Sequence, residues 1–229
     1  MSMIRTAALA LALMAFAAPA LAKENTLSAA EKKAGWKLLF DGKSLAGWRG
    51  FKTPEPDPGW TAKGGVLSPD PKTSKDIMTK AEFGNFELSF EWRISPKGNS
   101  GLMYHVLEKG DETYWSGPEY QVLDNARGEP PLQRAGALYD IYPTIADVPR
   151  PVGEFNQSRL VVNHGKVRHW LNGVVVAEYD LNSADFRARV ARSKFAQWGL
   201  FATGETGHIA LQNHGDVVAY RNLKIHELP

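Results

Sequence analysis

Residues 85–94 form the segment that most constrains the fold of this chain. Apolar residues at every second position alternate with charged or hydroxyl residues: Phe86, Leu88, Phe90, Trp92 and Ile94 against Glu87, Ser89, Glu91 and Arg93. Alternation with a period of two is typical of an antiparallel strand that buries one face. A second signal, Asn172-Gly173 between two apolar runs, predicts a two-residue hairpin turn.

Other short apolar runs carry the same signal, and helical signals are few. The sequence predicts further strands at residues 36–40, 76–79, 102–107, 119–124, 159–163, 167–171, 174–179, 199–202, 209–212 and 217–226. Helical turns are expected at 28–33, where Ser28 and Glu31 form a capping box, and at 183–192. So many short strands predict an all-β sandwich or jelly roll in one domain over residues 35–229, after an N-terminal extension at 23–34.

The first 22 residues have the three-part pattern of a secretory signal peptide. Arg5 precedes an apolar run over residues 7–18, and Ala20-Leu21-Ala22 supplies small residues before a cut. A membrane anchor is the weaker reading, because the run is short and polar sequence follows at Lys23. We therefore expect a periplasmic or otherwise secreted protein, with no membrane span after the signal is removed.

Composition excludes several functions. The chain has no cysteine, which excludes disulfides, thiolate catalysis and zinc-thiolate sites. A net charge of +2 gives no reason to expect a nucleic-acid partner. The basic cluster at residues 187–194, made of Arg187, Arg189, Arg192 and Lys194, is interpreted as the solvated side of a short helix.

The aromatic content points to a partner class. Seven Trp and seven Tyr residues suit a carbohydrate-binding surface as well as a core. The expected partner is a small-molecule carbohydrate, and the sequence does not fix the oligomeric state.

Residues 117–124, Gly-Pro-Glu-Tyr-Gln-Val-Leu-Asp, place two carboxylates and an amide on a segment patterned as a buried strand. Charged groups are seldom buried without a partner or a task. In a regular strand Glu119 and Gln121 share a face and Asp124 lies on the other, whereas one bulge would bring all three together. Such a set is suited to acid–base chemistry on a sugar, to a divalent cation, or to binding hydroxyls.

Several motifs, taken together, resemble the 3-keto-disaccharide hydrolase family. They span residues 35–228 in family order: 39–48 (LFDGKSLAGW), 98–105 (GNSGLMYH), 117–124 (GPEYQVLD), 136–139 (GALY), 169–173 (HWLNG), 207–215 (GHIALQNHG) and 220–223 (YRNL). The resemblance implies a concanavalin A-like jelly-roll β-sandwich of two curved antiparallel sheets. It also implies action on glycosides oxidised to a ketone at C3. Phe155 departs from the family, which usually has Trp before Asn156.

The candidate catalytic residues are Glu119, His105 and Asp124, and the same three are the candidate ligands of a divalent metal ion, the one cofactor left open. Glu119 has a structural alternative, an ion pair with Arg221 or Arg134, and Asp124 has another, capping the turn at Asn125. Candidate substrate-binding residues are Asn99, Ser100, Tyr104, Trp115, Gln121, Tyr139, Gln212, His214 and Arg221. We expect Glu119, Gln121 and His105 to converge on the concave sheet face, with Tyr104 or Arg221 nearby.

The function expected from these observations is that of an exported enzyme that cleaves 3-keto-glycosides or 3-keto-disaccharides. A base removes the C2 proton, which the ketone acidifies; the C1 oxygen leaves by elimination, and water then adds. Two alternatives stay open: a conventional retaining glycosidase, which needs two carboxyls roughly 5 Å apart, and a non-catalytic carbohydrate-binding module.

Overall fold

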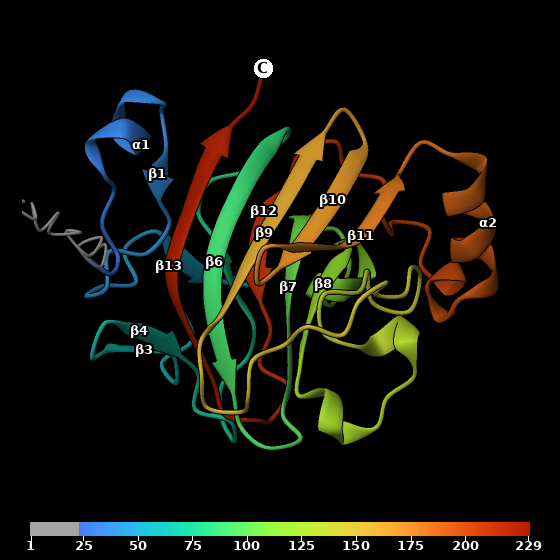
Figure 1. Cartoon of the computed structure of the whole chain (residues 1–229). Helices are drawn as coiled ribbons and strands as arrows, with labels where there is room; N and C mark the ends of the chain where they lie inside the picture. Colours follow the sequence, from blue (N-terminus) through green and yellow to red (C-terminus); the bar gives the residue numbers. More distant parts are fainter. Residues whose placement is uncertain (1–22) are drawn as a thin grey trace, which may run out of the picture.

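Two antiparallel β-sheets stacked face to face form the body of the protein (Figure 1). The computed structural model describes residues 23–229, so the predicted signal peptide at 1–22 lies outside the described residues. The larger sheet has the strand order β11-β10-β9-β6-β13-β4-β3, with β1 also pairing with β13. Its strands are β1 (Lys37–Leu38), β3 (Thr61–Lys63), β4 (Val66–Ser68), β6 (Phe86–Ile94), β9 (Asn156–Asn163), β10 (Lys166–Leu171), β11 (Val174–Asp180) and β13 (Val218–Glu227).

The smaller sheet has the order β2-β5-β12-β7-β8. Its strands are β2 (Trp48–Gly50), β5 (Ile77–Thr79), β7 (Asn99–Val106), β8 (Glu119–Leu123) and β12 (His208–Leu211). This architecture confirms the predicted all-β jelly-roll sandwich of two antiparallel sheets.

The core lies between the sheets, where the alternating pattern predicts it. Phe86, Leu88 and Phe90 of β6 are fully buried, whereas the polar residues between them are only partly buried. Polar groups that enter the core are paired, as buried polar groups must be: Trp92 Nε1 donates to Ser158 Oγ at 2.9 Å, and Ser158 Oγ donates to Tyr120 Oη at 2.9 Å. This chain of bonds crosses from the larger sheet to β8 of the smaller one.

Helices are short and lie outside the sheets. They are α1 (Ala29–Lys33), α2 (Ala184–Arg192) and the 3₁₀ turns η1 (Thr113–Trp115), η2 (Asn125–Arg127), η3 (Pro131–Gln133) and η4 (Lys194–Gln197). The predicted capping box of Ser28 and Glu31 is present at α1. Within residues 23–229, no helix is long and apolar enough to cross a membrane.

The strand predictions include one false strand and miss three short ones. Residues 199–202, expected as a strand, form turns after η4. Gly199 has no side chain that could pack on a sheet. The short strands β2, β3 and β4 were not predicted, because three-residue strands flanked by Gly and Pro are too short to show a period.

Two segments that leave the β-sandwich determine which residues cover β8. The long loop between β8 and β9 returns along that strand, and the Tyr139 backbone N–H donates to the Glu119 carbonyl at 3.0 Å. After β11 the chain enters α2, whose N-cap Ser183 accepts from the Phe186 N–H at 3.0 Å, and then η4. Figure 1 shows α2 beyond the β11 edge of the larger sheet.

Candidate active site

A cavity of about 310 Å³ lies on the face of the smaller sheet that is turned away from the larger one. Tyr120 faces the core, so its neighbours Glu119 and Gln121 face the opposite way. The cavity is lined by Asn99, Tyr114, Glu119, Gln121, Tyr139, Lys194, Phe195, Trp198, Gln212 and His214. The lining residues come from β7, β8, η1 and η4, from the loop after β8, from the residue after η4 and from the segment after β12.

Glu119 lines this cavity and is only 6% exposed. Its carboxyl group crosses over Gly101 on the neighbouring strand β7: a Cβ added at Gly101 would collide with Glu119 Oε1 and lie 2.6 Å from its Cδ. The glycine therefore makes the space that the carboxyl group occupies.

Burial, opposed by the charge of Lys194 and assisted by that of Asp76, raises the pKa of Glu119 to about 8. A carboxyl group with this pKa exchanges its proton close to neutral pH. Such a group suits general acid–base catalysis, for which the optimal pKa lies near the working pH.

Amide groups next to Glu119 have unused hydrogen-bonding capacity. Gln121 Nε2 donates to the Gln133 carbonyl at 3.1 Å and to Asn99 Oδ1 at 3.3 Å, while its Oε1 is buried and has no partner within residues 23–229. Gln212 Oε1 is likewise buried and unpaired in that part of the chain. Buried acceptors without a donor are costly, so both oxygens are suited to accept from water or from a sugar hydroxyl.

One wall of the cavity is aromatic. Trp198 stacks on Trp115 with ring centroids 5.7 Å apart and meets the edge of Tyr114 at 5.4 Å. Trp115 thus supports the wall from behind and does not itself line the cavity, whereas Trp198, Tyr114 and Tyr139 do. Flat aromatic rings of this kind stack on the apolar faces of sugars.

Several of these residues were missed by the sequence analysis: Asp76, Tyr114, Lys194, Phe195 and Trp198. Asp76, the residue before β5, accepts from Thr113 Oγ1 at 2.5 Å and from the Asn213 N–H at 3.0 Å. Burial raises its pKa to about 6. A run such as Lys-Asp-Ile-Met has no signal that marks its acid as part of a site; Lys194 was assigned to the solvated side of a helix.

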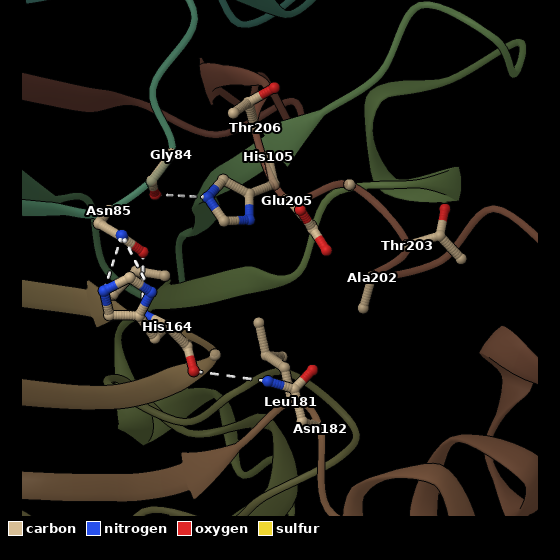
Figure 2. Close-up of a pocket in the computed structure, with 13 residues that line it drawn as sticks. Gly84, Asn85, His105, His164, Leu181, Asn182, Ala202, Thr203, Glu205 and Thr206 are labelled. Atoms are coloured by element: carbon tan, nitrogen blue, oxygen red, sulfur yellow. Dashed lines mark hydrogen bonds between the residues drawn. The ribbon is translucent and has the colours of Figure 1, made fainter. Parts of the chain in front are cut away.

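His105 does not converge with Glu119. It lines a second cavity of about 480 Å³ between the two sheets, together with Gly84, Asn85 and His164 (Figure 2). His105 Nε2 bonds the Gly84 carbonyl at 2.8 Å, and the His105 ring meets the Phe86 ring edge-on at 5.9 Å. The predicted position on the sheet face with Glu119 is wrong.

A bulge in β7 explains the position of His105. The pairing of β7 with β12 shifts between His208↔Val106 and Ala210↔Met103, which leaves one extra residue on β7. His105 also has a positive φ of 51°, so the strand alternation fails at this residue.

Asp124 is separate from the cavity as well. Strand β8 pairs regularly with β7 through Leu123, so no bulge turns Asp124 towards Glu119. Its Oδ2 accepts from the Lys97 N–H at 2.7 Å, and its Oδ1 accepts from the Ala126 N–H at 3.1 Å. The side chain caps η2, the structural alternative considered for it.

Three predicted substrate-binding residues also lie elsewhere. Ser100 and Tyr104 face the core, where Ser100 Oγ lies 2.7 Å from Tyr220 Oη and Tyr104 Oη lies 2.8 Å from Tyr179 Oη. Arg221 lies on the larger sheet, pairs with Glu91 at 2.7 Å and places its guanidinium 3.8 Å from the centre of the Phe155 ring. The cavity does collect Asn99, Gln121, Tyr139, Gln212 and His214 with Glu119, as expected.

The three metal-ligand candidates do not meet. Glu119 is in the cavity, His105 lies between the sheets, and Asp124 caps a turn. Over residues 23–229 the structure contains no group of three His, Asp or Glu side chains placed to share a metal ion.

Comparison with known proteins gives a consistent result. Residues 35–226 match the family described as the 3-keto-alpha-glucoside-1,2-lyase-like domain. A 3-keto-disaccharide hydrolase of Bacteroides thetaiotaomicron is 32% identical over 225 residues, which cover 83% of this chain and 78% of that protein.

Solved structures agree on the fold. The crystal structure of a candidate glycosyl hydrolase from Parabacteroides distasonis superposes with a TM-score of 0.83 at 32% identity, covering 90% of this chain and all of that one. Another from the same organism gives a TM-score of 0.66 at 26% identity, with coverage of 84% and 99%.

Proposed function

Because the chain belongs to the 3-keto-alpha-glucoside-1,2-lyase-like family, we propose that it cleaves the glycosidic bond of 3-keto-glycosides or 3-keto-disaccharides. The relative named 3-keto-disaccharide hydrolase supports this substrate class. The observation that carries the proposal is the position of Glu119, a buried carboxyl group that lines a cavity with polar and aromatic walls.

The proposed reaction begins with proton transfer. The C3 ketone acidifies the proton on C2, and the ionised carboxylate of Glu119 accepts it. The electron pair of the C2–H bond forms an enolate. Its collapse breaks the bond between C1 and the glycosidic oxygen, which takes up the proton carried by Glu119, and leaves a C1=C2 double bond. Addition of water across that bond then gives the free 3-keto sugar.

The raised pKa of Glu119 supports this role. With a pKa of about 8, roughly one-tenth of the carboxyl groups are ionised at pH 7, but each ionised group is a stronger base than an ordinary glutamate. The buried site also keeps bulk water from competing for the proton.

The remaining walls match a sugar ring. The unpaired side-chain oxygens of Gln121 and Gln212 can accept hydrogen bonds from sugar hydroxyls, and the Trp198 ring can stack on the sugar. The cavity volume of about 310 Å³ is at the small end for ligand pockets, which suits one sugar ring inside and the rest of the glycoside towards the opening.

Conventional retaining hydrolysis has less support. It needs a second carboxyl about 5–5.5 Å from the first, and among the cavity-lining residues of the described chain Glu119 is the only carboxylic acid.

The deciding experiment incubates the purified protein with matched glucosides and 3-keto-glucosides, with and without a chelator. We expect cleavage of the 3-keto compounds alone. Cleavage of the plain glucosides would favour the retaining glycosidase, and binding without cleavage of either would favour a carbohydrate-binding module. Loss of cleavage with chelator would show that a metal ion takes part.

We also propose that the protein is exported, because residues 1–22 have the pattern of a signal peptide. Mass spectrometry of the protein recovered from the cell envelope and medium should give a chain that begins at Lys23. Folded protein that retains Met1 and stays in the cytoplasm would contradict export.

A further inference from the structure

Lys194 is the cationic side chain of the Glu119 cavity. Helix α2 ends at Arg192, and the Ser193 side chain caps η4 by accepting from the Phe195 N–H at 3.1 Å. This change of direction separates Lys194 from the arginines of α2, and Lys194 lines the cavity. Within the described chain, it is the only Lys or Arg that lines that cavity.

An aromatic side chain holds the ammonium group of Lys194 in place. Its Nζ lies 4.3 Å from the centre of the Tyr139 ring and donates to Tyr139 Oη at 3.3 Å. It also lies 5.3 Å from the centre of the Phe195 ring. Cation–π contacts of this kind fix the position of a charge without neutralising it.

The charged and titratable groups around Glu119 come from four elements. Lys194 comes from η4, Asp76 from the residue before β5, and His214 from the segment after β12. Tyr220, whose pKa is raised mainly by burial and in part by Glu119, comes from β13. Of these groups, Lys194 is the one whose charge favours the ionised carboxylate of Glu119, and Asp76 opposes it.

We propose that Lys194 is a catalytic residue that stabilises the negative charge on the C3 oxygen while Glu119 holds the proton taken from C2. This role rests on the proposed function. The C2–H bond breaks, its proton forms an O–H bond with Glu119, and its electron pair becomes the C2=C3 bond as the C3 oxygen gains the charge. Lys194 donates an N–H to that oxygen and remains protonated throughout, so no further reactant is needed.

The positive charge of Lys194 also acts before the substrate binds. A cation near Glu119 increases its ionised fraction, and the ionised form is the one that accepts the proton. Tyr139 is then a positioning residue, because it holds Lys194 through its ring and its hydroxyl oxygen.

The first test compares turnover of a 3-keto-glucoside by Lys194→Met, Lys194→Arg and a control, Lys63→Met. Lys63 is an exposed lysine on β3 of the larger sheet, so the control makes the same change in net charge far from the cavity. Removing one donor to a developing oxyanion typically costs about 10²–10³-fold in kcat. We expect a loss of that size for Lys194→Met, partial recovery in Lys194→Arg, and turnover within about twofold of wild type for Lys63→Met. A Lys194→Met enzyme as active as the control would overturn the proposal.

The second test needs no turnover. The carboxyl pKa of Glu119 is measured by ¹³C NMR on protein labelled at Glu side chains, with Glu119→Gln to assign the signal. Lys194→Met should raise this pKa, and Lys194→Arg and Lys63→Met should leave it near the wild-type value. An unchanged pKa in Lys194→Met would show that the two groups do not interact.

The two tests separate the proposal from the function on which it rests. If wild-type protein cleaves no 3-keto-glycoside, the proposed function fails, and the enolate role of Lys194 fails with it whatever the NMR result. If wild type cleaves the substrate and Lys194→Met does too, only the assignment of Lys194 fails. Reductive trapping with cyanoborohydride adds a further check, because a covalent imine on Lys194 would contradict a purely electrostatic role.

Discussion

The cavity around Glu119 and the cavity around His105 both use the small sheet, and each buries one titratable side chain. Glu119 is 6% exposed and His105 is 4% exposed. Burial raises the pKa of Glu119 and lowers that of His105, so both groups favour their neutral form. By burial alone, the two residues are equivalent candidates for catalysis.

The surroundings separate them. Glu119 faces unpaired amide oxygens, an aromatic wall and a lysine. The Nε2 of His105 must carry a hydrogen, because its partner, the Gly84 carbonyl, can only accept, and this bond fixes the ring to the main chain. Its Nδ1 is buried and unpaired within residues 23–229, but in that part of the chain no Tyr, Trp, Lys or Arg side chain lines the cavity around it. A buried titratable group thus becomes a catalytic candidate through the groups that it faces, and the contrast predicts which substitutions will affect activity.

The largest expected effect is on proton transfer. Glu119→Gln keeps the shape and removes the base, so turnover of a 3-keto-glucoside should fall by about 10²–10⁴-fold, while binding is better preserved. His105→Asn is the matched change, because asparagine tolerates the positive φ at this position. It should retain turnover within about threefold and affect mainly thermal stability, since it alters a buried hydrogen bond worth about 1 kcal/mol. Steady-state kinetics on both variants, with thermal unfolding as the control, measure the difference. Equal losses in the two variants would break the comparison.

A steric change at Gly101 should have the next largest effect. In Gly101→Ala the new methyl group occupies the place of the Glu119 carboxyl group, which must move out of position. A displacement of about 1 Å at a catalytic group can cost roughly 10²-fold in rate. Gly199→Ala is the control, because no atom lies within 4 Å of a Cβ added there. Normal activity in Gly101→Ala would mean that the position of Glu119 over this glycine is not required.

The aromatic wall should affect substrate binding more than chemistry. Trp198→Ala removes the ring that stacks on Trp115, and loss of a stacking contact of about 0.5–1.5 kcal/mol corresponds to a rise in KM of roughly two- to tenfold. Trp170→Ala is the comparison, since Trp170 lies on β10 of the larger sheet beneath Arg159. A fall in kcat with KM unchanged in Trp198→Ala would assign this residue to the chemical step instead.

The smallest effect is a shift in the pH profile. If Glu119 is the base, kcat/KM should rise with pH and level off above about pH 8, where the carboxyl group is ionised. Asp76→Asn removes a neighbouring negative charge that raises this pKa, so the rising limb should move to lower pH. A limb that falls with rising pH would mean that Glu119 acts as an acid.

Much of the fold was predictable because the main signals are local. The alternation in residues 85–94 identified β6, and the motif pattern placed Glu119 and Gln121 on one face of a strand, where both now line the cavity. In these segments the side chains that form the alternating pattern also determine which face of the strand is buried, so the sequence is sufficient to predict that face.

The rest of the site depends on contacts that the sequence does not encode locally. His105 is misplaced because a bulge in β7 depends on pairing with β12, more than 100 residues away. Lys194 lines the cavity because η4 contacts Tyr139 of the loop after β8, although Arg187 and Arg192, which precede it in the sequence, are exposed. Asp124 could have been assigned as a cap from the Asp-Asn-Ala turn, and this structural alternative was the correct one.

The central claim is that Glu119 removes the C2 proton of a 3-keto-glycoside. The most direct test runs the reaction in deuterium oxide with substrate that carries hydrogen at C2, and follows that position in the product by NMR and mass spectrometry. The account predicts that wild type replaces the C2 hydrogen with deuterium, and that Glu119→Gln slows this exchange in proportion to cleavage. Product that retains its C2 hydrogen in full would contradict the claim and leave direct hydrolysis of the glycosidic bond.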